Sequence, residues 1–85
     1  MDVKSRRMMN EVWMNSHYGG TTFSFVTKPG RDAASVRNLE RNGFLSDVVE
    51  LEVAKGMRVD GKITDWGRKF CLSRFGEPPA QVKEE

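Results

Sequence analysis

Residues 31–75, RDAASVRNLERNGFLSDVVELEVAKGMRVDGKITDWGRKFCLSRF, decide the fold, because a helical pattern, two alternating segments and a second helical pattern follow one another. At the start of this stretch, Val36 and Leu39 recur at helical spacing. Gly43 follows where a glycine commonly ends a helix. The sequence therefore predicts an amphipathic helix over residues 31–42.

Two segments with the period of a β-strand come next. Residues 47–53 place three aliphatic residues on one side and Glu50 and Glu52 on the other, the pattern of a strand with one buried side. Residues 57–63 alternate in the same way. Two turn signals are present, at Lys55-Gly56 and at Asp60-Gly61, and either would give a short antiparallel ribbon.

The stretch ends in a second helical pattern. Thr64 is a natural N-cap, and Trp66 and Phe70 recur at helical spacing after it. A glycine inside a helix costs on the order of 1 kcal/mol relative to alanine, so Gly67 suggests that another element approaches closely there.

Upstream, residues 3–16 predict one helix, with Asp2 as its N-cap and a methionine stripe, Met8 and Met9, that we assign to the core. Residues 21–26 are rich in aromatic and β-branched side chains, which favours an extended segment. A short helical turn remains the alternative for these six residues.

Length and composition define the class of protein. Eighty-five residues form one small domain, and 38% apolar with 31% charged residues is typical of a folded globular chain. We expect a domain over residues 1–76 and a disordered acidic tail over residues 77–85. The sequence contains neither a signal peptide nor an apolar run long enough for a bilayer, which predicts a cytoplasmic protein with no membrane partner.

Catalytic and metal-binding signatures are missing from the sequence. Cys71 is the single cysteine, so no internal disulfide is possible, and with His17 it is too few for a structural zinc site. We assign Cys71 to the core. Neither a nucleophile elbow nor a phosphate-cradling glycine loop occurs. We therefore expect a protein that is not an enzyme and that needs no cofactor and no metal.

Two motifs resemble the winged helix-turn-helix superfamily. Residues 35–45, SVRNLERNGFL, resemble a recognition helix with the strand that follows it, and residues 63–70, ITDWGRKF, resemble the element that commonly follows a wing. The small size is similar to that of virus- or plasmid-encoded members. The resemblance implies an α+β fold with about three helices and a two- or three-stranded antiparallel ribbon. It also implies a helix before residue 31, which the sequence indicates only weakly.

The resemblance and the cations together predict a DNA-binding regulator of transcription. Residues 31–42 would act as the recognition helix and residues 54–62 as a basic wing. In that arrangement Arg37, Asn38 and Arg41 would contact base edges, and the other candidates would hold phosphates. The predicted contacts to double-stranded DNA are Arg31, Ser35, Arg37, Asn38, Arg41, Lys55, Arg58 and Lys62. This prediction requires the helix cations and the ribbon cations to face the same way.

The alternative is a protein-binding module or inhibitor that uses the same scaffold on a host protein. The net charge of only +2 and the acidic residues Glu50 and Glu52 favour this alternative. The contact surface would then be the methionine-rich first helix or the acidic strand face. For either function, a chain this small could work as a homodimer.

Overall fold

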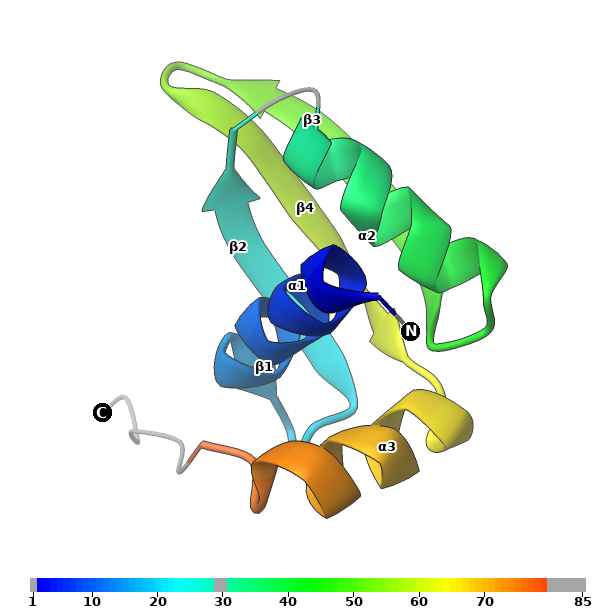
Figure 1. Cartoon of the computed structure of the whole chain (residues 1–85). Coiled ribbons are helices and arrows are strands. Elements are labelled where there is room, and N and C mark those ends of the chain that lie inside the picture. The colour runs from blue at the N-terminus through cyan, green and yellow to red at the C-terminus, as the bar shows by residue number, and fades with distance from the viewer. Residues whose placement is uncertain (1, 29–30, 80–85) are drawn as a thin grey trace, which may run out of the picture.

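The computed structural model describes residues 2–28 and 31–79, which form three helices and four strands (Figure 1). In chain order the elements are α1 (Val3–Met14), β1 (Ser16–His17), β2 (Thr22–Thr27), α2 (Arg31–Arg41), β3 (Leu45–Val53), β4 (Gly56–Ile63) and α3 (Asp65–Phe75). The α+β class is therefore confirmed. The last six residues of the predicted tail, 80–85, lie outside the described residues.

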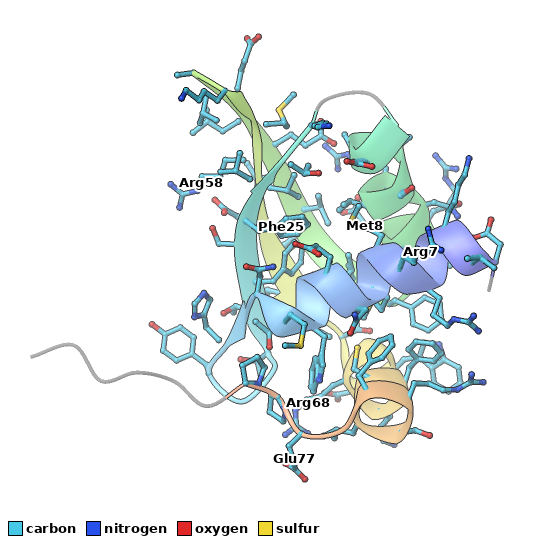
Figure 2. The ribbon with its side chains drawn as sticks, turned by 60° about the vertical axis from the view of Figure 1, so that its left-hand side comes forward. Arg7, Met8, Phe25, Arg58, Arg68 and Glu77 are labelled. Atoms are coloured by element: carbon cyan, nitrogen blue, oxygen red, sulfur yellow. The ribbon has the colours of Figure 1, made fainter. Side chains whose placement is uncertain are left out.

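The strands form one antiparallel sheet in the order β1-β2-β4-β3. Helices α1 and α2 lie on one face of this sheet, and α3 lies across one end (Figure 1). The opposite face, which we call the open face, is covered by no element of the described chain (Figure 2). The molecule is thus a sheet with helices on one side.

Residues 21–26 form a strand and not a helical turn. Phe23 and Phe25 of β2 are buried and point toward the helices, while Ser24 between them lies on the open face. Because β2 pairs with β4, and β1 adds a short edge, the sheet has four strands where two or three were expected. A strand thus occupies the place of the supporting helix, and the winged-helix arrangement is not confirmed.

Helices α1 and α3 begin at the predicted capping residues. The side chain of Asp2 accepts a hydrogen bond from the Ser5 amide at 2.8 Å, and Thr64 accepts one from the Gly67 amide at 3.0 Å. Gly43 follows α2 with φ of 86°, a conformation that glycine adopts readily. The predicted helix of residues 3–16 ends two residues early, at Met14.

The core lies between the sheet and helices α1 and α2. The side chain of Trp13 is fully buried, and its Nε1 donates to the carbonyl of Gly76 at 3.1 Å, which ties α1 to the end of α3. Burial also raises the pKa of the Cys71 thiol to about 12. Met8 and Met9 are buried, as predicted for core residues. Fully buried side chains include Met9, Val12, Trp13, Val36, Leu39, Val59 and Cys71.

The sequence pattern predicts that the aliphatic side chains of residues 47–53 face the core, and for β3 this prediction is wrong. A β-bulge between Ser46 and Val49 places one extra residue in β3, and Asp47 in this bulge has φ of 54°. One extra residue reverses which side chains face the core. Val49 and Leu51 are therefore 59% and 56% exposed on the open face. Their neighbours Glu50 and Glu52 lie on the side of the helices.

The hairpin turn falls at Ala54-Lys55, so the first of the two turn signals is used. Asp60-Gly61 lies inside β4, where the position of Gly61 is crowded by the ring of Phe23. No helix in the described ranges has the length and apolar character needed to cross a membrane.

Candidate nucleic-acid interface

Arg37, the central cation of the predicted recognition helix, is held in a network with two carboxylates. Its Nη1 donates to Glu40 at 2.9 Å and its Nε donates to Glu50 at 2.8 Å. Nη1 also lies 3.3 Å from the carbonyl oxygen of Val48. The hydrogen bond that Arg37 donates to Glu40, followed by the one that it donates to Glu50, raises the pKa of Arg37. Nε and Nη1 of this guanidinium are engaged within the chain, so it links α2 to β3.

The other predicted contacts on α2 point in different directions. Asn38 donates to the hydroxyl of Ser5 at 3.3 Å and so lies between α2 and α1. Ser35 also faces the α1 side, where it lines a cleft. Arg41 is exposed in the last turn. Arg31 begins α2, but its side chain is outside the described part of the structure. Of the guanidinium groups described on this helix, that of Arg37 is engaged by carboxylates and that of Arg41 is exposed.

Two of the three predicted ribbon cations, Arg58 and Lys62, lie on the far side of the sheet from α2. Arg58 pairs in register with Val26 and Leu51 on the open face, and Figure 2 shows it pointing away from α1. Its Nε contacts Asp60 at 3.1 Å. Lys62 shares this face. The requirement that the helix cations and the ribbon cations face the same way is therefore not met, because β4 alternates and only its Val59 side faces the helices.

A different set of cations does come together. An open cleft of about 630 Å³ lies between the first turns of α1, the end of β2 and the start of α2, with the β3–β4 turn at its rim. We call it the cationic cleft. Its cations come from three separate segments of the chain. They are Lys4, Arg7, Lys28 and Lys55.

Charge in the cationic cleft is unbalanced. Two acidic residues, Glu11 and Asp32, line it beside the four cations, and Asp32 also accepts a hydrogen bond from Thr27 at 3.0 Å. Within residues 2–28 and 31–79, none of the four cations forms an ion pair. The N-terminal end of α2 adds positive potential from the helix dipole. The cleft can therefore attract anions.

Three of these cations, Lys4, Arg7 and Lys28, were not predicted as contacts. One local signal was available, because a lysine in the first turn of α1 opposes the helix dipole, which favours acidic residues at that end. Lys55 was predicted, with a role in the wing. Their convergence depends on long-range packing, since β2 carries Lys28 to a position beside the first turns of α1.

The contact surfaces of the protein-binding alternative are not available as predicted. Met8 and Met9 are buried, and Figure 2 shows Met8 between α1 and the sheet. Glu50 lies on the helix side and is engaged by Arg37. The methionine stripe is thus buried, and of the two acidic residues Glu50 is engaged while Glu52 stays exposed.

The described residues contain no group of three or more side chains that could hold a metal ion. No protein-family model, curated protein sequence or solved structure matches the chain. The functional argument therefore depends on the geometry and charge of the described residues.

Proposed function

We propose that the protein binds double-stranded DNA through its phosphate backbone, with the cationic cleft as the contact site. The convergence of Lys4, Arg7, Lys28 and Lys55 around one open cleft carries this proposal. Cations that form no ion pair with the described residues can neutralise phosphates without first breaking such contacts. Release of counterions from the DNA then drives binding.

The contacts proposed here are electrostatic and independent of base sequence. Arg37 and Asn38, the residues best suited to reading base edges, make hydrogen bonds within the chain. Lysine binds phosphate as a compact charge and carries little sequence information. We therefore propose similar affinities for duplexes of different sequence.

Each cation has a distinct place in the proposed complex. Lys4 and Arg7 are one turn apart on α1 and would follow one stretch of backbone. Lys28 and Lys55 would contact phosphates on the opposite side of the cleft. Asp32 and Ser35 line the cleft near the N-terminal end of α2. This helix end would add a weaker attraction for phosphate.

A salt titration with labelled duplex DNA, followed by fluorescence anisotropy, tests the proposal. If all four cations contact phosphates, the logarithm of the affinity should fall with the logarithm of salt concentration at a slope of about −3 to −4. The double variant Lys4→Ala, Arg7→Ala should reduce the steepness of the slope by about 1 to 2.

The matched control is Arg41→Ala, Lys69→Ala, which removes two exposed cations outside the cleft. Both double variants remove two positive charges. A difference in DNA affinity between them therefore reports where the cations lie and not the total charge. Loss of affinity in the control equal to that in the cleft variant would overturn the proposal. So would a wild-type protein that fails to bind duplex at low salt.

A further inference from the structure

The open face carries exposed aliphatic side chains on both sides of the charged strand β4, and no element of the described residues covers it. In β-sheet register, Val26, Arg58 and Leu51 form one row across three strands, and Ser24, Asp60 and Val49 form the next. Val26, Val49 and Leu51 are each more than half exposed. Exposed aliphatic side chains that gather on one sheet face are typical of an interaction surface.

The bulge in β3 specifies this exposure. Without the extra residue at Asp47, the alternation of residues 49–53 would turn Val49 and Leu51 toward the helices. With it, Glu50 turns inward instead and requires Arg37 as its partner. The strand therefore places a carboxylate on the helix side and aliphatic residues in solvent. This arrangement stabilises the single domain less than one with the aliphatic residues facing the helices and the carboxylate in solvent.

Charges on the open face are balanced. Asp60 pairs with Arg58, and Lys62 Nζ lies 3.4 Å from Asp47 Oδ2. The hydroxyl of Ser24 donates a hydrogen bond to Asp60, and this bond, together with the Arg58 contact, lowers the pKa of that carboxyl. A face with two cations and two anions does not repel a copy of itself. Each of its charges can meet an opposite charge of an identical face.

We infer that the open face is the interface of a homodimer, in which two copies of this chain pack sheet against sheet. An interface between identical faces must be complementary to itself, and the opposite charges of Arg58 and Asp60 on the central strand β4, with aliphatic residues on both sides of that strand, fulfil this condition. The small side chains of Ser24 and Ser46 allow a second sheet to approach to the spacing of about 10 Å that packed sheets adopt. The lysine and arginine of α1 that line the cationic cleft lie on the helix side, so the dimer leaves them accessible.

Sedimentation equilibrium over a range of protein concentrations tests this inference without DNA. Wild type should convert from monomer to dimer as concentration rises. Leu51→Lys places a charge among the exposed aliphatic side chains of β3 and should weaken the dimer about tenfold or more. Met14→Lys is the matched control, because Met14 is also an exposed apolar residue, at 59%, but lies on α1. This control should dimerise like wild type.

Circular dichroism establishes whether each variant is folded. If Leu51→Lys fails to fold, Val49→Thr keeps a β-branched residue on the same face and should still weaken the dimer. A wild type that stays monomeric at every concentration would overturn the inference and would point to a different occupant. A dimer unaffected by a folded Leu51→Lys, as edge-to-edge pairing through β3 would give, would overturn it as well.

Discussion

Arg37 Nε lies 2.8 Å from Glu50 Oε2, and this contact joins the middle of α2 to a residue that faces the helices only because β3 is bulged. The guanidinium that the sequence assigns to base recognition is thus the partner of a carboxylate on the helix side of the sheet. With Glu40 as its second carboxylate, Arg37 has a structural role in holding α2 against β3.

Replacement of this arginine should therefore affect stability and not DNA affinity. Arg37→Met should lower the free energy of unfolding by about 1 kcal/mol, since the pairs are partly exposed and screened by solvent. Urea denaturation of Arg37→Met, Glu50→Gln and the double variant would measure the coupling between the two residues. Duplex affinity should stay within about twofold of wild type. A large loss of affinity with unchanged stability would instead support base recognition by α2.

Asp47 in the bulge has a backbone conformation that β-branched residues avoid. Asp47→Val should destabilise the protein by about 1 to 2 kcal/mol, because its Cβ substituents crowd the backbone at positive φ. Asp47→Gly relieves this strain but loses the contact with Lys62, so its stability should change by less than about 1 kcal/mol. Chemical denaturation compares the two variants. Equal stability of Asp47→Val and wild type would contradict the assigned bulge geometry.

Gly67 lies where α3 passes against the backbone of Phe44. A Cβ at this position would collide with the Phe44 carbonyl oxygen, which cannot easily move because it accepts the amide of Thr64 at 3.1 Å. Gly67→Ala should therefore destabilise the protein by about 1 to 3 kcal/mol, although helix propensity alone predicts a gain of about 1 kcal/mol. Ser73→Ala, at an exposed position of the same helix, is the control and should be neutral or slightly stabilising. A stabilised Gly67→Ala would show that α3 is further from Phe44.

Asp60 should contribute to the acid sensitivity of the fold. The hydrogen bond from Ser24, followed by the contact with Arg58, lowers the pKa of Asp60 in the folded protein below its unfolded value. A group with a lowered pKa stabilises the fold above its unfolded pKa, about 3.9 for aspartate, and loses that contribution as pH falls through the folded pKa. Asp60→Asn should thus be less stable than wild type at neutral pH, and the difference should shrink below about pH 4. A difference independent of pH would contradict this assignment.

The sequence predicts the three helices well, because their ends are marked by local chemistry. Asp2 and Thr64 cap the starts of α1 and α3 through their side chains. After α2, Gly43 adopts a positive φ. The close approach at Gly67 was also predictable from the cost of a glycine inside a helix, and the structure confirms it.

Which side of β3 faces the core was not predictable from local chemistry. An aspartate does not by itself mark a β-bulge in a sequence. Residues 47–53 alternate regularly whichever side of the strand faces the core. The error had a direct consequence for the site, since it placed Glu50 in solvent and left Arg37 without its partner. The strand identity of β2 was likewise left open, and its pairing with β4 brings Lys28 to the cationic cleft. Convergence of residues from distant segments is a property of tertiary packing that local patterns do not contain.

Contact between the cationic cleft and the phosphate backbone of duplex DNA is tested most directly by amide NMR spectra recorded during a titration with duplex DNA. The proposal predicts that the largest shift changes occur at Lys4, Arg7, Lys28 and Lys55 and in the first turn of α2, and that high salt reverses them. Shift changes centred on Arg41, or on Arg58 and Lys62 of the open face, with the cleft unaffected, would contradict it.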